Sequence, residues 1–248
     1  MTTPKYLKKT MKIAIMQPYF FPYLGYFQLI NQCDKFIIYN DVQFIERGWI
    51  NRNNFLINKT PTLVSVPLLK ASCSKKINEI EIDYNNKQLK KSINTIKQNY
   101  SKAPFFKDVF QIFHDSILSS NKKTIDYTCF NAFIMIKEYL NMKTEFIFSS
   151  EIDYDRNSSS VEKINNLSSI FNSKEILFPS GSRNLYSTSD FPSFATYSIV
   201  PNFTPYNQNT KLFFPGLSML DVLMFNDKTT INKMLNDFKK CSLDDKLY

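Results

Sequence analysis

The stretch MKIAIMQPYFFPYLGYFQLINQCDKFIIYND, residues 11–41, decides the fold of this chain. It begins with a short apolar run, which is typical of a buried strand. Pro18 and Pro22 follow this run, and a loop is expected there because proline interrupts regular backbone hydrogen bonding. A helix is then predicted over residues 24–32, where the apolar residues share one side, and a second buried strand over residues 35–39.

This order of elements is that of a βαβ unit, which requires a parallel sheet with a right-handed crossover. Strand and helix patterns continue along the chain to about residue 226. We therefore expect an α/β protein with a three-layer Rossmann-like fold, a mainly parallel sheet and helices on both faces. Ligands of such sheets bind beyond the carboxyl ends of the strands. The loops that follow residues 16 and 39 are thus expected to form the functional site.

Three segments are predicted along the chain. Residues 1–10 are expected to be a flexible N-terminal extension, because they are polar and basic and precede the patterned sequence. Residues 11–226 are expected to form a single α/β domain. Residues 227–248 are expected to form a C-terminal helix and tail, with the helix over residues 229–240.

Further strands are predicted inside the domain over residues 62–67, 77–82, 144–149, 175–178 and 197–202. Apolar and polar residues alternate over residues 77–82, as they do in a half-buried strand. Residues 197–202 are predicted to form an edge strand, because Pro201 cannot donate a backbone hydrogen bond.

Composition limits the class of protein. The cysteines are scattered without a C-x-x-C pair and the chain has one histidine, so neither a disulfide framework nor a metal site is expected. No apolar stretch is long enough to cross a bilayer, and the first ten residues lack the apolar core of a signal peptide. We therefore expect a cytoplasmic protein without integral membrane contact. The sequence does not determine whether the protein is a monomer or an oligomer.

The net charge of +9 indicates attraction for anions. The lysines are spread over the whole chain and form no dense basic run that alternates with aromatic residues, as in a nucleic-acid-binding strip. A solvated lysine-rich surface is the simplest interpretation. The phosphates of a nucleotide-linked substrate, a membrane leaflet and an RNA all stay open as anionic partners.

Glycine and arginine are scarce in this chain, and their positions are informative. The chain has 4 glycines, whereas an average composition would give about 17. Most of the glycines and arginines, and the single tryptophan, fall within residues 25–52 and 181–183. Glycine permits positive φ, and arginine offers a bidentate fork that lysine lacks. These two segments are therefore candidates for function.

The first candidate group consists of Gln17, Tyr19 and Tyr23. A glutamine directly after a buried strand can bind an amide or a hydroxyl group, and tyrosines offer stacking and a donor. The alternative is aromatic packing in a turn. The position of these residues at the sheet edge favours a functional role over packing alone. Gln17 is a candidate catalytic residue, and Tyr19 and Tyr23 are candidate substrate-binding residues.

A second group follows the strand at residues 35–39 and mixes a carboxylate, carboxamides, an arginine and an indole: Asp41, Gln43, Trp49, Asn51, Arg52 and Asn53. Carboxamides bind hydroxyl groups, an indole stacks on a sugar ring, and Arg52 could bind a diphosphate. Asp41 is the candidate general base, because amide formation requires deprotonation of an ammonium nucleophile. The alternative is an Asp–Arg salt bridge with asparagine-capped turns.

Two weaker signals lie further along the chain. Ser182 and Arg183 follow a predicted strand in a turn that could bind an anion, although it lacks the spacing of a known phosphate-binding loop. His114 stands beside Asp115 on a predicted helix and is a candidate catalytic residue. The alternative for His114 is a lone surface histidine, because no other candidate lies next to it.

Tyr206 and Gln208 are further candidates for substrate binding. Ser218 and Asp221 are expected to be buried in an apolar helix, where they need partners, and could brace the site from behind. The alternative is a satisfied buried polar group without a direct role.

The runs MQPYFFPYLGYFQLI, FIIYNDVQF, GWINRN and LSMLD resemble the WbqC-like protein family. The resemblance covers nearly the whole chain from Met11 to about Asn226. It implies a role in the biosynthesis of bacterial surface polysaccharide (O-antigen), with transfer of glycine or another acyl group to an amino sugar as a proposed activity. No established catalytic residues come with the resemblance.

The entry to the first helix is also similar to that of nucleotidylyltransferases with a HIGH motif. Pro22 and Tyr26 stand where the two histidines of that motif would stabilise the transferring phosphate. The similarity therefore argues for a shared fold and against nucleotidylyl transfer.

The leading hypothesis is an N-acyltransferase, glycyl or other aminoacyl, acting on a nucleotide-linked amino sugar. The alternatives are a non-catalytic accessory protein that binds a nucleotide sugar and a degenerate nucleotidylyltransferase-like enzyme. No tightly bound cofactor is expected. A carrier-protein thioester, coenzyme A and an aminoacyl-tRNA are all open as acyl donor, so an acyl carrier protein or a tRNA is a candidate partner.

Overall fold

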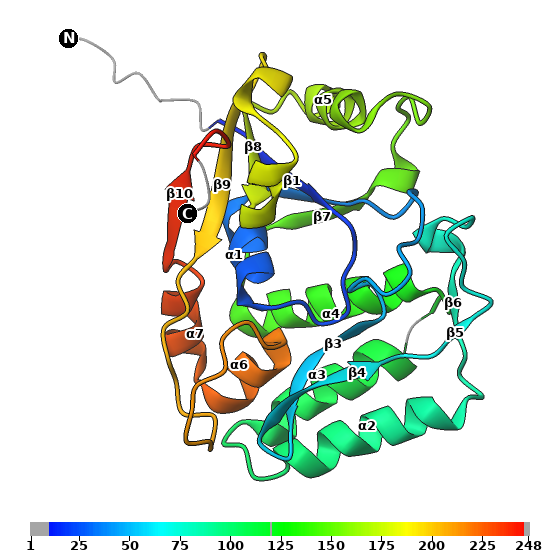
Figure 1. Cartoon of the computed structure of the whole chain (residues 1–248), viewed down its shortest axis with the longest axis vertical. Helices are drawn as coiled ribbons and strands as arrows, with labels where there is room; N and C mark the ends of the chain where they lie inside the picture. The colour runs from blue at the N-terminus through cyan, green and yellow to red at the C-terminus, as the bar shows by residue number, and fades with distance from the viewer. Residues whose placement is uncertain (1–9, 120, 246–248) are drawn as a thin grey trace.

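A six-stranded sheet forms the centre of the computed structural model, which describes residues 10–119 and 121–245 (Figure 1). The strand order is β10-β9-β8-β1-β2-β7. The strands are β1 (Lys12–Met16), β2 (Lys35–Ile38), β7 (Glu145–Phe148), β8 (Glu175–Pro179), β9 (Ala195–Pro201) and β10 (Phe238–Cys241). All neighbouring pairs are parallel except β9 and β10. The prediction of an α/β fold with a mainly parallel sheet is confirmed.

The order of the strands reverses at β1. The chain passes from β1 to β2 and β7 on one side, and then returns to add β8 and β9 on the other. Ala14 of β1 accordingly pairs with Phe36 of β2 and with Leu177 of β8. The carboxyl ends of β1 and β8 lie side by side while their connections lead to opposite sides, which is the arrangement that opens a ligand crevice.

Apolar side chains alternate between the two faces of the sheet. Ala14 and Phe36 belong to the larger core, and Ile13 and Ile37 to a smaller one. The larger core includes residues of α1 (Leu24–Gln32), α2 (Lys87–Tyr100), α3 (Phe106–Leu118), α4 (Ile125–Leu140), α6 (Met219–Phe225) and α7 (Lys228–Met234). The smaller core contains α5 (Ser160–Ile170). The predicted helices on both faces are present, and the two layers are very unequal.

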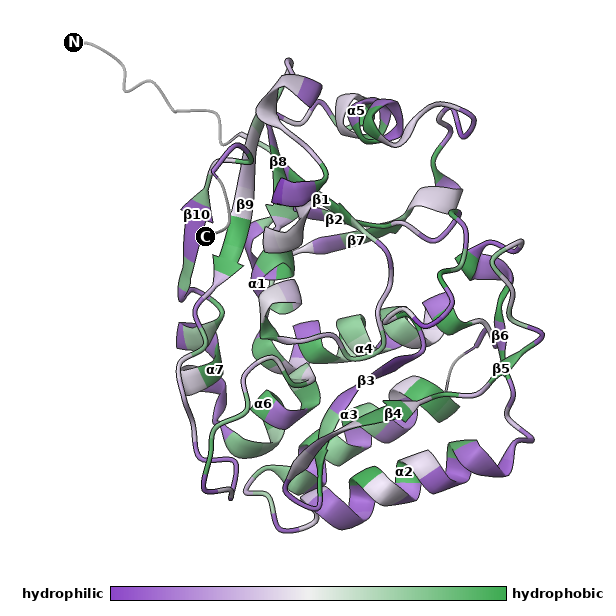
Figure 2. Ribbon diagram, viewed as in Figure 1, coloured by the Kyte–Doolittle hydropathy of each residue, from purple (hydrophilic) through white to green (hydrophobic). Residues whose placement is uncertain are grey.

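The connection from β2 to β7 supplies most of the buried residues of the larger core that lie outside the six-stranded sheet. It contains the hairpin of β3 (Arg52–Ile57) and β4 (Thr60–Ser65), and the short pair of β5 (Leu68–Leu69) and β6 (Glu81–Ile82). The hairpin lies beside α2 (Figure 1), and the Phe55 ring of β3 lies 6.2 Å from the Phe113 ring of α3. Figure 2 shows α2 as largely hydrophilic with apolar residues on one side, and its buried Leu89, Ile93 and Ile96 supply that side.

The loop after β1 is held in an uncommon conformation. Phe21 has a φ of 43°, a left-handed value that is unusual for a bulky residue. The Asn53 amide donates to the carbonyls of Phe20 (3.0 Å) and Phe21 (2.7 Å), and the Ser218 hydroxyl also donates to Phe21 (2.7 Å). These bonds from β3 and from the start of α6 fix the path of the loop.

The first three predicted elements are confirmed, since β1, α1 and β2 lie where expected. The strand predicted over residues 77–82 was wrong for its first half, which is a 3₁₀ turn at Ile77–Glu79. Ile77 and Ile80 are both buried, and their spacing of three fits a helical turn better than a strand.

Two predictions about the carboxyl-terminal part were also wrong. Strand β9 is not at the edge, because β10 pairs with it and places Phe238 opposite Pro201. The predicted helix over residues 229–240 ends at Met234, since the following segment satisfies the open edge of β9 instead. Residues Phe238–Cys241 therefore complete the sheet. Of the predicted flexible extension at residues 1–10, only Thr10 lies among the described residues.

Candidate functional site

The candidate site lies where β1 and β8 end. Gln17 follows β1 directly and is half-buried, and its carbonyl accepts a hydrogen bond from the Tyr26 hydroxyl of α1 (2.7 Å). Beside it, β8 leads into the 3₁₀ turn Ser180–Asn184. Ser182 is buried in that turn, and its carbonyl accepts the backbone N–H of Tyr186 (2.9 Å). The predicted Gln17 and Ser182 segments thus come together at one edge of the sheet.

Two partly exposed tyrosines, Tyr19 and Tyr23, follow Gln17 in the loop between β1 and α1. Burial raises the pKa of Tyr19. Burial also raises the pKa of Tyr23, while a hydrogen bond with Ser180 opposes that rise. The contact between Tyr23 and Ser180 joins the loop after β1 to the turn after β8.

Two further tyrosines, Tyr39 directly after β2 and Tyr186 after the turn that follows β8, pack against the smaller core. Burial, followed by the charge of Asp41, raises the pKa of Tyr39 to about 12, and the nearby Tyr186 adds a smaller contribution. The Tyr186 ring packs against Phe178 and Phe191 of the smaller core, with ring centroids 5.7 Å apart in both pairs. Phenols with raised pKa values stay protonated near neutral pH, so they offer hydroxyl donors and aromatic faces.

Asp41 lies at the centre of a polar cluster at the ends of β2 and β7. Its carboxylate accepts hydrogen bonds from the Tyr154 hydroxyl (2.9 and 3.0 Å), the Arg156 Nε (2.8 Å) and the Ser149 hydroxyl. The Asp41 side chain is 3% exposed and the Arg156 side chain 35%. A buried carboxylate is stable only with such partners, so this cluster fixes the ends of two neighbouring strands.

Asn40 extends the cluster into the protein. Its amide donates to Asp126 of α4 (2.8 Å), and its carbonyl oxygen accepts from the Ser149 hydroxyl (3.3 Å) and the Ser150 backbone N–H (3.1 Å). Asp126 is fully buried, and burial raises its pKa, while hydrogen bonds from Thr124 and Asn40 lower it. The cluster thus links the sheet edge to the first turn of α4.

The partner of Asp41 is Arg156, not the Arg52 that its neighbourhood in sequence suggested. The Arg156 guanidinium also donates to the Ile152 carbonyl (2.8 Å) and lies over the Tyr154 ring, 4.6 Å from its centroid. Sequence reasoning singled out neither Tyr154, Arg156 nor Ser149 as a site residue. Arg156 is one of the few arginines of the chain, but it lies outside the two segments that this scarcity marked as candidates.

Arg183 lies at the sheet edge in the turn after β8. Its guanidinium is half-buried and donates to the carbonyls of Ser180 (3.4 Å) and Asp245 (3.3 Å). Both contacts are long, so the guanidinium keeps capacity to bind an anion.

Several residues of the predicted polar loop lie elsewhere. Asn53 holds the loop after β1, and the Asn51 amide donates to the Val66 carbonyl (2.8 Å). Gln43 and Trp49 are exposed. Arg52 donates to the Gly48 carbonyl (2.8 Å) and lines a separate cavity. The structure therefore divides the predicted loop into a part at the sheet edge and a part on the hairpin.

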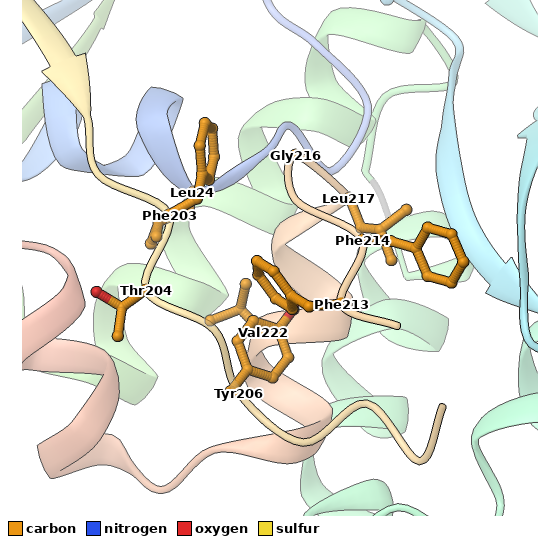
Figure 3. Close-up of a pocket in the computed structure, with 9 residues that line it drawn as sticks. All are labelled: Leu24, Phe203, Thr204, Tyr206, Phe213, Phe214, Gly216, Leu217 and Val222. Atoms are coloured by element: carbon orange, nitrogen blue, oxygen red, sulfur yellow. The ribbon is translucent and has the colours of Figure 1, made fainter. Parts of the chain in front are cut away.

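Tyr206 and Gln208 belong to a buried network around Asp221. The carboxylate of Asp221 accepts from the hydroxyls of Tyr206 (2.6 Å) and Tyr100 (2.8 Å) and from the Gln208 amide (3.0 Å). Figure 3 shows Tyr206 beside Phe213 around a cavity of about 10 Å³, which holds roughly one water molecule. This geometry supports the structural alternative for these residues.

His114 lies on α3, outside the loops that follow the central strands. Its Nδ1 pairs with the Asp115 carboxylate (2.9 Å), and its ring lies 6.1 Å from that of Phe110. The described residues contain no group of three histidine, cysteine, aspartate or glutamate side chains that could hold a metal ion. None of the described helices is both long and apolar enough to span a membrane.

Comparison with known proteins places the chain in a family. The WbqC-like protein family matches residues 17–233. An uncharacterized protein of Mycobacterium tuberculosis (strain ATCC 25618 / H37Rv), Rv1507c, is 27% identical over 227 residues, which are 87% of this chain and 93% of that protein. No solved structure matches the chain significantly. Since the family match includes both strand-end loops, the Asp41 cluster and the turn after β8, this chain belongs to the WbqC-like protein family.

Proposed function

We propose that this protein transfers an acyl group, glycyl or another aminoacyl group, to the amino group of a nucleotide-linked sugar in surface-polysaccharide biosynthesis. The placement of Gln17, Tyr23, Tyr39 and Arg183 in the segments that follow β1, β2 and β8, at the switch point of the sheet, carries the proposal. A nucleotide sugar combines an anionic diphosphate with rings that bear hydroxyl groups, and this edge offers a counterpart for each. Membership of the WbqC-like family supports the link to polysaccharide biosynthesis.

In this function the diphosphate binds at the turn Ser180–Asn184, where Arg183 supplies the guanidinium. The sugar binds in the space between Tyr23 and Tyr39, beside Gln17. The protonated phenols and the Gln17 side chain can donate to sugar hydroxyl groups and to a carbonyl oxygen in the transition state.

Asp41 was expected to be the general base that deprotonates the sugar ammonium group. Its two oxygens accept hydrogen bonds from Ser149, Tyr154 and Arg156, so it would have to release one donor to accept a proton. The geometry supports a positioning role, in which Asp41 orients Tyr154 and Arg156. The role as base stays a prediction, which the pH dependence of turnover in Asp41→Asn tests.

The second candidate function is that of an accessory protein that binds a nucleotide sugar without chemistry of its own. Two observations favour it: the carboxylate of Asp41 is already engaged, and His114 lies on α3. Binding of the nucleotide sugar is common to both functions, whereas amide formation belongs to the first alone.

The test combines nucleotide-linked 4-amino sugars with glycyl and other acyl thioesters and the full-length chain, and detects the amide by mass spectrometry. Arg183→Gln should raise KM for the sugar about tenfold, as expected when a charged contact of about 1.4 kcal/mol is lost. Lys174→Gln is the matched control, because Lys174 is exposed and precedes β8 at the opposite edge of the sheet. Binding without any amide would support the accessory function, and absence of both would reject the proposed site.

A further inference from the structure

A second cavity opens on the hairpin, apart from the carboxyl edge of the sheet. Its volume is about 340 Å³, and its walls include Phe44, Arg47, Asn51, Arg52, Leu63 and Leu68. This volume lies within the range of small-molecule sites, roughly 300–1,000 Å³. The walls come from the loop after Asp41, from both strands of the hairpin and from β5.

The two arginines give this cavity its chemical character. The Arg52 Nε donates to the Gly48 carbonyl (2.8 Å), which orients the guanidinium and leaves its terminal nitrogens for another partner. Neither Arg47 nor Arg52 forms an ion pair among the residues that the structure describes. Glu46 also lines the cavity, so the walls carry two positive charges against one negative charge.

Backbone strain is a second, independent feature of the same wall. Arg47 has a φ of 59°, a left-handed value that a long side chain rarely adopts. Lys59 has a similar value in the hairpin turn, so the left-handed backbone fixes the turn at Arg47 but does not by itself mark a binding site. The turn is closed by a hydrogen bond from the Gly48 N–H to the Ile45 carbonyl (3.2 Å), which keeps the Arg47 side chain beside the cavity.

The apolar walls indicate that the ligand is more than an inorganic anion. Phe44, Leu63, Leu68 and Ala71 line the cavity, and Leu63 is 47% exposed. Large apolar side chains that gather at the rim of a charged cavity are typical of a ligand site. The ligand that fits combines a phosphate group with an apolar portion.

We propose that this cavity binds the phosphopantetheine group of an acyl donor, supplied either as coenzyme A or on a carrier protein. This inference rests on the proposed function, in which the nucleotide sugar occupies the sheet edge and the donor needs a separate anion site. It reassigns Arg52 from the sugar diphosphate to the donor. The loop that forms the cavity is tied to the loop after β1 by the bond from the Phe20 N–H to the Trp49 carbonyl (3.1 Å). This bond places the two loops side by side, and in the proposed arrangement the pantetheine arm runs from the cavity along this junction toward Gln17.

The chain offers closely matched variants for the test. Arg47→Asn removes the guanidinium and keeps a residue that tolerates the left-handed conformation. Lys59→Asn is its control, since exposed Lys59 has a φ of 63° in the turn between β3 and β4, outside the cavity. Both variants lose one positive charge at the same kind of backbone position. Arg52→Gln tests the second guanidinium.

The measurement is isothermal titration of the full-length chain with coenzyme A, with pantetheine, which lacks phosphate, and with a phosphopantetheine-bearing carrier protein. We expect coenzyme A or the carrier protein to bind at least tenfold more tightly than pantetheine. Arg47→Asn and Arg52→Gln should weaken that binding at least tenfold, whereas Lys59→Asn should not change it. The donor that competes for the site at lower concentration identifies the source of the group.

Three outcomes would overturn the inference: equal weakening by Lys59→Asn, pantetheine binding as tightly as coenzyme A, or binding of tRNA in place of both pantetheine-linked donors. Failure of the proposed function would look different. Coenzyme A would then bind in the cavity with the expected dependence on Arg47, but no amide would form on any amino sugar. Conversely, amide formation that is equal in wild type, Arg47→Asn and Arg52→Gln would keep the function and reject this cavity as the donor site.

Discussion

Loss of the ion pair between Asp41 and Arg156 should loosen the ends of β2 and β7. Arg156→Ala removes the 2.8 Å bond to the Asp41 carboxylate and the 2.8 Å bond to the Ile152 carbonyl. The Asp41 side chain is 3% exposed, so water cannot readily replace the lost partner there. The remaining donors, Tyr154 and Ser149, are neutral hydroxyl groups.

The magnitude follows from burial. Breaking a fully buried ion pair costs about 3–5 kcal/mol, and a hydrogen bond to a charged group contributes about 1.5–3 kcal/mol. Arg156 is 35% exposed, so solvent screens part of its interaction, and we expect the free energy of unfolding to fall by about 2–3 kcal/mol. For a chain of this size that corresponds to a Tm lower by roughly 4–12 °C.

The assay is urea unfolding of the wild type, Arg156→Ala, Asp41→Asn and the double variant, which gives the coupling energy of the pair. Lys35→Gln is the control, because Lys35 pairs with Glu145 at the amino end of the same two strands, with side chains 19% and 60% exposed. The control should lose less than about 1 kcal/mol. If Arg156→Ala loses no more than Lys35→Gln, or if the coupling energy is zero, Asp41 does not organise this edge.

Three other substitutions test the surroundings of the site. The Cβ introduced by Gly25→Ala would overlap the Tyr23 ring. We therefore expect the free energy of unfolding to fall by about 1–3 kcal/mol and nucleotide-sugar binding to weaken in calorimetry. Unchanged binding would show that Tyr23 is not part of the site. Asn53→Ala removes both hydrogen bonds from the Asn53 side-chain amide to the carbonyls of Phe20 and strained Phe21. The free energy of unfolding in urea should fall by about 1–3 kcal/mol. A loss below about 0.5 kcal/mol would contradict this role. Burial raises the pKa of Asp221, so the folded protein holds a proton that the unfolded chain releases. Stability from this group is therefore present below about pH 4 and is lost as the pH rises through the folded pKa. Asp221→Asn should gain stability relative to the wild type as the pH rises, and parallel curves of unfolding free energy against pH would refute this reasoning.

The local sequence determined the elements at the start of the fold. The apolar run before Gln17, the prolines in the loop and the striped helix over residues 24–32 are short-range patterns, and β1, α1 and β2 occur where these patterns predict them. The same patterns predicted a parallel sheet, because a βαβ unit has no other compact arrangement. They also indicated that Gln17 and Asp41 would lie at the carboxyl edge.

Tertiary structure decided which residues share that edge with them. Arg156 and Tyr154 follow Asp41 by more than a hundred positions, and they meet it only because β7 pairs with β2. Arg52 is close to Asp41 in sequence but does not pair with it, because Arg52 begins β3, which belongs to the hairpin and not to the six-stranded sheet.

Long-range pairing also overrode local preference at the carboxyl-terminal end. Residues after Met234 carry a helical pattern, but they form β10 because the backbone of β9 would otherwise be left without partners on one side. Local sequence specifies which segments can be strands or helices through short-range sterics and apolar periodicity. Strand order, which requires contacts between distant segments, decides which side chains become neighbours in the site.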